Sequence, residues 1–424
     1  MTTRQHRGKD MRRFTKLLSV VLLVVLLTSS VAGVTLAAGV PSGTYVGYTP
    51  YNWIYSDWFI RKYGPTHPLA VYDWDNTCIY NDIMETMFRF QMFNLQYAMT
   101  KDAFDAMIPE AAGKTLKDTN VTQFSADYGS IALPDIAADL EEDYAFLYDH
   151  YIGTRQMSLD EVKATPEYQD FLVKLPFLYD GLTDTPEIGA EYSYPWVCFL
   201  CQGMTKPEVQ KMAVAALNDA LGRKCEKVTL KAPAGLDRRA AVSSYSYKAG
   251  IRLSLGIVDM MSKQRATGWK VWVVSASFEP VIQAVAAING YDVPEDHVIG
   301  VRLQMDASGK YLPKLSEEPG YALTQRMGKA TVIRNLIKQA PLFVAGDSDG
   351  DFEMMTQFPE TKLIYLINRV KGGDIGSLYK EALPGKAKPG RVVLLQGRDE
   401  NKGLWRPFQE TIKLGKTTPS PIES

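Results

Sequence analysis

Two aspartates, Asp73 and Asp75, stand two positions apart directly after the apolar residues 69–72. On an extended or tightly turning backbone, residues i and i+2 point the same way, so we expect the two carboxyl groups to lie side by side. Adjacent carboxylates repel each other and lose hydration, which is costly unless a cation or a shared proton compensates. Taken alone, the string also fits an acidic turn that caps the next helix, because Asp and Asn favour such turns.

Three further groups of residues supply partners for these carboxylates. Ser275 follows a second apolar run, Lys329 opens an expected helix, and the acidic loop 346–351 follows a third apolar run. Ser277 is a weaker alternative for the hydroxyl, because Ser275 is the first to follow its strand. In phosphoryl chemistry a carboxylate can attack phosphorus, and a protonated carboxyl can supply a proton and then activate water. Lysine and hydroxyl groups neutralise the phosphoryl oxygens.

The apolar runs belong to a regular α/β pattern in the second half of the chain. Alternating strands and helices predict a doubly wound, mostly parallel sheet with right-handed crossovers. Such sheets bind ligands at the carboxyl ends of their strands, where the residues named above would meet. The expected strands are 69–72, 271–274, 342–345, 362–367 and 391–395, and the expected helices are 253–264, 280–288 and 329–339.

Four motifs in this order make the chain resemble the haloacid dehalogenase superfamily of phosphatases. The resemblance covers about residues 65–97 and 250–400 and implies a Rossmann-like core. The motifs are Asp73-x-Asp75-x-Thr77, Ser275, Lys329 and Gly346-Asp347-Ser-x-x-Asp351.

The resemblance implies a role for each motif residue. Asp73 would be the nucleophile that forms an aspartyl phosphate, and Asp75 would be the general acid and base. Ser275 and Lys329 would bind the phosphoryl group, and Thr77, which closes the first motif, joins the substrate-binding set. Dehalogenases of this superfamily lack the second aspartate, so Asp75 favours a phosphatase.

The resemblance also implies a magnesium site. Mg²⁺ would be held by Asp73, the backbone carbonyl of Asp75 and Asp347, with Asp351 as a supporting carboxylate. These are hard oxygen ligands, which Mg²⁺ prefers. The acidic run 347–351 also invites a calcium-loop interpretation, but it lacks the distal Glu and the flanking helices of such a loop.

A large insertion separates the first two motifs. Roughly 200 residues lie between Thr77 and Ser275, far more than a simple crossover between parallel strands needs. We expect a mainly helical cap domain at 98–244, with the catalytic core formed by 39–97 and 245–415. In the superfamily such a cap selects the substrate. Within it, 182–193 is expected to be a loop.

The cap and the first helix offer groups for a cationic substrate. The sequence around Asp75 is similar to secreted phosphorylcholine phosphatases and, more distantly, to phosphoserine phosphatases, whose substrates carry a cationic nitrogen. Asp82 and Glu85 share one helix face near the site, although acidic residues there also suit the helix dipole. Tyr192, Tyr194 and Trp196, expected in a cap loop, would form an aromatic cage for a quaternary ammonium group or simply pack in the cap.

The N-terminus resembles an export signal. Six basic residues precede the apolar run 20–27, and small residues follow, which predicts a secretory signal peptide at 1–38. An uncleaved anchor from 17 to about 40 is the alternative. We therefore expect an exported protein, extracellular, at the cell surface or periplasmic, with no membrane partner after cleavage. With 47 basic and 48 acidic residues, no nucleic-acid partner is expected.

These observations favour an exported Mg²⁺-dependent phosphomonoesterase that acts on a small organic phosphate such as phosphocholine. The alternatives are a phosphoserine phosphatase-like enzyme, a phosphotransferase or mutase, and a non-catalytic surface ligand-binding protein, which the intact motif residues argue against.

Cys198 and Cys201 are interpreted as two buried thiols or a local disulfide, because no second pair completes a zinc site. The polar tail 416–424 is expected to be disordered.

Overall fold

The computed structural model of the chain describes residues 47–111 and 123–422. The chain divides into two compact units, Met1–Pro41 and Ser42–Ser424. The first unit, with the predicted signal peptide at 1–38, lies outside the described residues. Within the described part, no helix combines the length and the apolar character that a bilayer crossing requires.

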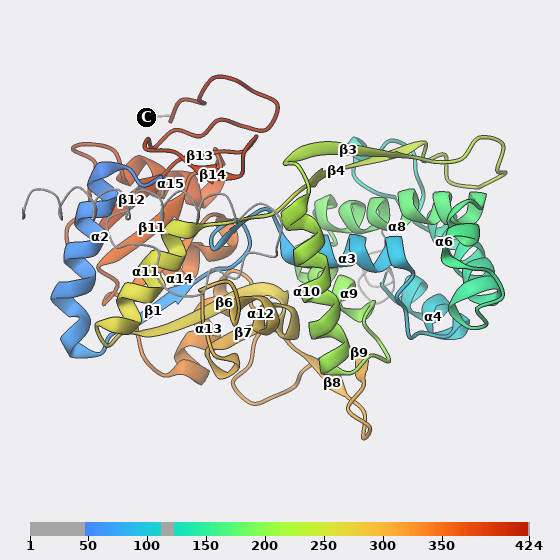
Figure 1. Cartoon of the computed structure of the whole chain (residues 1–424), viewed down its shortest axis with the longest axis horizontal. Coiled ribbons are helices and arrows are strands. Elements are labelled where there is room, and N and C mark those ends of the chain that lie inside the picture. The colour runs from blue at the N-terminus through green and yellow to red at the C-terminus, as the bar shows by residue number, and fades with distance from the viewer. Residues whose placement is uncertain (1–46, 112–122, 423–424) are drawn as a thin grey trace, which may run out of the picture. The chain divides into compact units, whose positions relative to one another are not determined.

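A six-stranded sheet forms the centre of the fold, with the order β12-β11-β10-β1-β6-β7 (Figure 1). All of its neighbouring strands run parallel, which confirms the predicted doubly wound α/β fold. From β1 the chain builds the sheet outward through β6 and β7, and it later adds β10 to β12 on the other side. The strands are β1 (Leu69–Tyr72), β6 (Lys270–Phe278), β7 (Val298–Val301), β10 (Pro341–Gly346), β11 (Leu363–Ile367) and β12 (Val392–Gln396).

Both faces of this sheet are covered by helices. Along β1, Ala70 and Tyr72 belong to one hydrophobic cluster, while Leu69 and Val71 belong to another. This alternation explains why the strand reads as a continuous apolar run: each residue is buried on one face or the other. Outside the insertion, the helices that contribute to the larger cluster are α2 (Pro50–Tyr63), α11 (Leu255–Ala266) and α12 (Glu279–Ala286). Those of the smaller one are α13 (Met327–Val332), α14 (Phe352–Thr356) and α15 (Gly373–Glu381).

The insertion begins and ends at a short pair of antiparallel strands, β2 (Ile79–Tyr80) and β5 (Arg252–Leu253). The described part of the insertion is mainly helical. Its helices are α3 (Ile83–Asn94), α4 (Lys101–Ala111), α6 (Leu133–Leu147), α7 (Leu159–Lys163), α8 (Pro166–Asp184), α9 (Ala190–Phe199) and α10 (Lys206–Gly222). The division into core and cap domains stays a prediction.

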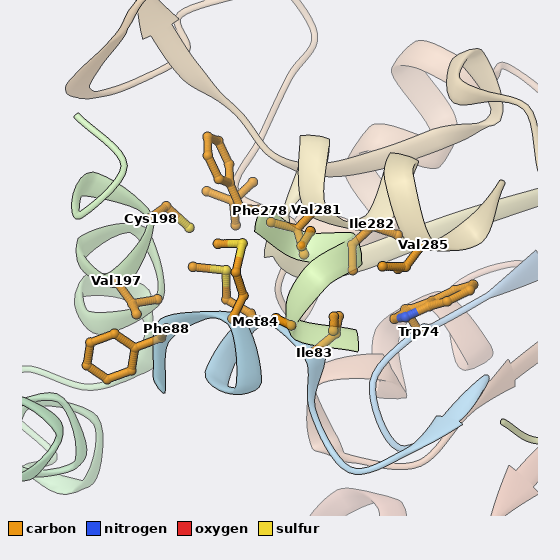
Figure 2. Close-up of a cluster of buried hydrophobic side chains, with 14 of the residues drawn as sticks. Trp74, Ile83, Met84, Phe88, Val197, Cys198, Phe278, Val281, Ile282 and Val285 are labelled. Atoms are coloured by element: carbon orange, nitrogen blue, oxygen red, sulfur yellow. The ribbon is translucent and has the colours of Figure 1, made fainter. Parts of the chain in front are cut away.

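The insertion and the sheet region share a hydrophobic cluster. Figure 2 shows side chains of α3, α9 and α12 meeting there. The labelled residues include Met84, Phe88, Val197, Cys198, Val281 and Ile282. Because α12 belongs to the sheet region, the insertion rests on the same element that follows the Ser275 strand.

One local prediction differs from the structure. The segment 182–193 is not a continuous loop, because α8 runs to Asp184 and α9 begins at Ala190. A β-hairpin, β3 (Glu226–Lys231) and β4 (Ser244–Ala249), follows the helices of the insertion. In the tail, Ser420 donates a backbone hydrogen bond to Thr411 and Ile422 packs on the smaller cluster, while its disorder stays a prediction.

Candidate active site

The two aspartates of the first motif enter a cavity at the carboxyl end of β1. The Asp73 amide donates to the carbonyl of Ala345 at 2.9 Å, which continues the pairing of β1 with β10 by one residue. The chain then turns tightly, and Trp74 points into the hydrophobic core. Asp73 and Asp75 both line a cavity of about 270 Å³, so the two carboxyl groups face the same space.

Lys329 links the first motif to the acidic loop. Its Nζ lies 2.6 Å from Asp73 Oδ1 and 2.7 Å from Asp351 Oδ1, and all three side chains are buried. Burial disfavours the ammonium group, but the two carboxylates outweigh this and hold the pKa of Lys329 above its usual value. Burial, with the Asp351 charge, raises the pKa of Asp73. The lysine is therefore charged and fixed beside the reactive carboxyl group.

Thr77 connects the first and fourth motifs. Its hydroxyl lies 3.1 Å from Asp73 Oδ2 and 3.0 Å from Asp347 Oδ1. Thr77 is fully buried and does not line the cavity. The sequence places Thr77 in the substrate-binding set. In the structure its hydroxyl bridges the carboxyl groups of Asp73 and Asp347.

Arg369 is a site residue that the sequence analysis missed. It follows β11, and its Nη1 lies 2.5 Å from Asp347 Oδ2. Burial alone would raise the pKa of Asp347, but the guanidinium charge outweighs it and holds that pKa below its usual value. The position after the end of a parallel strand was the available signal, but no motif residue marks Arg369.

Three carboxylates lie close enough to share one metal ion. Oxygens of Asp73, Asp347 and Asp351 lie within 4.8 Å of one another. Asp351 accepts the most hydrogen bonds of the three. One of its oxygens accepts from Lys329, and the other accepts from the backbone amides of Asp347 and Ser348. Asp73 and Asp347 keep lone pairs for a cation, so Asp351 suits the predicted supporting role.

Asp75 is held apart from this cluster. Its Oδ1 accepts a hydrogen bond from the Ile83 amide at 2.6 Å, and its Oδ2 accepts one from the Ser277 hydroxyl at 2.6 Å. Burial, with the charge of Asp82, raises its pKa. Ser275 and Ser277 both line the cavity from within β6, which runs on to Phe278 instead of ending before Ser275.

Acidic and aromatic side chains from the insertion also line the cavity. Asp82, Glu85, Tyr179 and Tyr194 line it together with Met84. Burial and the neighbouring Glu85 raise the pKa of Asp82 to about 7. The Asp82 carboxylate also accepts from the Glu85 amide at 2.8 Å, so Asp82 caps α3 as well as facing the cavity.

The three residues of the expected aromatic cage do not all reach the cavity. Tyr192, Tyr194 and Trp196 lie on helix α9, not on a loop. Trp196 is fully buried beside Tyr179, and Tyr192 does not line the cavity, whereas Tyr194 does. Helical spacing turns alternate residues to different sides, so three residues at i, i+2 and i+4 cannot surround one ligand.

Cys198 and Cys201 do not line the cavity. Both are buried free thiols, which is one of the two states that the sequence leaves open. In the described ranges, the aspartate cluster is the one group of three or more His, Cys, Asp or Glu side chains placed to hold a metal ion.

Comparisons with known proteins agree with this site. The family model for haloacid dehalogenase-like hydrolases matches residues 206–356, which contain Ser275, Lys329, Asp347 and Asp351. The chloroplastic phosphoserine phosphatase of Arabidopsis thaliana is 30% identical over 115 residues, which are 26% of this chain and 37% of that protein. A conserved, functionally unknown protein from Anaerococcus prevotii DSM 20548 is 27% identical, with a TM-score of 0.78, and covers 86% of this chain and 97% of its own.

The family model stops short of Asp73, but the fold brings that residue against Lys329 and Asp347. The sheet order, the four motifs and the matched segment together make the chain similar to the haloacid dehalogenase-like hydrolases.

Proposed function

We propose that this protein is a Mg²⁺-dependent phosphomonoesterase that works through an aspartyl phosphate on Asp73. The observation that carries the proposal is the joining of Asp73 to Lys329 and, through Thr77, to Asp347 at the wall of one cavity. The Arabidopsis relative, which is named as a phosphoserine phosphatase and matches over 115 residues, supports the same class of reaction.

The contacts around Asp73 suggest a role for each side chain in the reaction. Asp73 attacks phosphorus, and the bond from phosphorus to the leaving oxygen breaks. Lys329 and Ser275 hydrogen-bond the phosphoryl oxygens, on which negative charge accumulates. Asp75 donates its proton to the leaving oxygen and then takes one from the water that hydrolyses the aspartyl phosphate. All four side chains line the same cavity.

The residues present fit a divalent cation. Three buried carboxylates, Asp73, Asp347 and Asp351, have oxygens within 4.8 Å of one another, and a divalent cation would offset their mutual repulsion. Asp73 and Asp347, with the backbone carbonyl of Asp75, would hold Mg²⁺. A bound Mg²⁺ would offset the repulsion between the carboxylate nucleophile and the phosphate dianion.

The substrate we propose is a small phosphomonoester with a cationic nitrogen, of the phosphocholine type. Asp82 and Glu85 supply negative charge to the cavity wall, and Tyr179 and Tyr194 supply aromatic surface. A quaternary ammonium group binds both kinds of surface. Phosphoserine is the second candidate, favoured by the printed name of the Arabidopsis relative.

Export is also a proposal, and it rests on the sequence of residues 1–38. The mature enzyme would then meet organic phosphates outside the cell or in the periplasm. N-terminal sequencing of the protein recovered from the medium or periplasm tests this, and a chain that still begins at Met1 in the cytosol would contradict it.

The direct test of the function is phosphate release by the purified protein. With Mg²⁺ it should hydrolyse p-nitrophenyl phosphate and phosphocholine, and a chelator should abolish both activities. Full turnover without a divalent ion would contradict the mechanism. Absence of turnover on a broad set of phosphomonoesters would favour the non-catalytic alternative.

A further inference from the structure

The carboxyl group of Asp75 accepts hydrogen bonds from two different parts of the fold. Its Oδ1 accepts from the backbone amide of Ile83, the first residue of α3, and its Oδ2 accepts from the hydroxyl of Ser277 on β6. Both hydrogen bonds are 2.6 Å long. The terminal torsion of an aspartate is broad, so one bond alone leaves the carboxyl group free to turn. The Ser277 bond is the one that a side-chain substitution can remove.

Ser275 and Ser277 divide two tasks between them. They stand two apart on β6, and both line the cavity. The Ser277 amide donates to Ser275 Oγ at 3.1 Å and so occupies an acceptor position of that oxygen. Across residues 47–111 and 123–422 we find no protein group that accepts the Ser275 hydroxyl hydrogen, whereas the Ser277 hydrogen goes to Asp75. Ser275 is thus free to donate to a phosphoryl oxygen, and Ser277 is not.

We propose that Ser277 is a positioning residue that holds Asp75 in place to protonate the leaving oxygen. The proposal rests on the proposed function. In this step the carboxylate of Asp73 forms a bond to phosphorus while the bond between phosphorus and the leaving oxygen breaks, and the electron pair of the broken bond stays on that oxygen. The proton of Asp75 moves to the same oxygen, and Asp75 becomes a carboxylate. Ser277 keeps its hydrogen bond to the carboxyl group throughout and transfers no proton.

Loss of proton donation should slow substrates with poor leaving groups more than substrates with good ones. Loss of folding or of phosphoryl binding should slow both kinds of substrate alike. An alkoxide leaving group needs the proton, whereas 2,4-dinitrophenolate leaves readily as an anion. The ratio kcat/KM reports the steps up to formation of the aspartyl phosphate. Comparing kcat/KM for ethyl phosphate and 2,4-dinitrophenyl phosphate therefore measures the contribution of Asp75 as proton donor. Neither substrate carries a cation, so attraction to Asp82 and Glu85 does not affect the comparison.

Ser277→Ala should lower kcat/KM for ethyl phosphate by about 10- to 100-fold, the cost of a misplaced catalytic group. Its effect on dinitrophenyl phosphate should be several times smaller. Ser277→Thr keeps the hydroxyl and should restore most of the activity on ethyl phosphate. Asp75→Asn should show the same selectivity for the poorer leaving group, with a larger loss.

Two control variants separate this role from others. Ser275→Ala should reduce kcat/KM for both substrates to a similar extent, because every substrate carries the phosphoryl group. Ser193→Ala removes a hydroxyl that is equally buried but bonded to Thr183 and away from the cavity. It should leave both values unchanged, which controls for loss of a buried hydroxyl.

Equal losses on the two substrates in Ser277→Ala would overturn the proposal and assign Ser277 to the phosphoryl group. No loss on either substrate would overturn it as well. If Ser277→Ala does not fold, Ser277→Cys gives the same comparison with a weaker donor. A wild-type protein that hydrolyses neither substrate would refute the proposed function itself, which is a separate and visible failure.

Discussion

Thr77 donates its hydroxyl toward both Asp73 and Asp347, although 270 positions of sequence separate Thr77 from Asp347. The link spans the neighbouring strands β1 and β10, whose carboxyl ends carry the two aspartates. One buried hydroxyl thus links two carboxylates that would bind the same ion in the proposed mechanism. The predictions below test this arrangement from different sides.

Asp73→Asn should reduce turnover at least about a thousandfold, because an amide is a poor nucleophile for phosphorus. The substitution keeps the size of the side chain, so the far-ultraviolet circular dichroism spectrum should match that of the wild type. A mutant rate within tenfold of wild type would remove Asp73 as the nucleophile.

Thr77→Val should weaken magnesium binding about 10- to 100-fold, the usual cost of losing a group that orients metal ligands. Turnover measured against Mg²⁺ concentration should show half-saturation at a correspondingly higher concentration. Thr77→Ser retains the hydroxyl and serves as the control. An unchanged magnesium dependence in Thr77→Val would contradict the bridging role.

Asp82→Asn should raise KM for phosphocholine without raising KM for 3,3-dimethylbutyl phosphate, the uncharged carbon analogue. The neutral side chain loses its attraction for the ammonium group but keeps its shape and its place at the start of α3. Equal effects on the two substrates would assign Asp82 to helix capping alone.

The preference for the cationic substrate should also depend on pH. The pKa of Asp82 is raised to about 7, so its carboxylate becomes protonated as the pH falls below that value. The ratio of kcat/KM for phosphocholine to that for 3,3-dimethylbutyl phosphate should therefore fall between pH 8 and 6. Because both phosphates ionise alike, the ratio removes their own titration. A ratio that stays constant in the wild type would count against the cation site.

Lys174→Ala should destabilise the inserted helices without touching the cavity. Lys174 is buried on α8 and pairs with Asp139 at 2.7 Å and Asp170 at 2.6 Å, so its removal leaves buried carboxylates short of a partner. Losses of about 3–5 kcal/mol are usual in such cases. Urea unfolding measures the change, and a loss below about 1 kcal/mol, the value for a surface pair, would mean that the network is dispensable.

The sheet and the motif residues at its carboxyl edge could be predicted because their signals are local. A buried parallel strand reads as an apolar run, as at residues 69–72, and the motif residue stands at or near its carboxyl end. Asp347 stands at the end of β10 in the same way, whereas the signal for Lys329 was the start of an expected helix. The family resemblance then supplied roles that spacing alone could not.

The remaining features depend on tertiary contacts that leave no local pattern. Arg369 is an ordinary arginine until the fold places it on Asp347, and the Ser277 hydroxyl turns to Asp75 only once β6 lies beside β1. The loop expected at Trp196 leaves both a ligand cage and packing within the cap open, whereas the structure has helix α9 there. The burial of Trp196 is decided by packing beside Tyr179, which the sequence analysis had not selected.

The most direct measurement is chemical trapping of the covalent intermediate. Rapid addition of borohydride to enzyme turning over a phosphomonoester with Mg²⁺ reduces an aspartyl phosphate to homoserine, which peptide mass spectrometry locates. The mechanism predicts homoserine at position 73, with none in Asp73→Asn or without substrate. Trapping at a different residue, or none at all while phosphate is released, would contradict it.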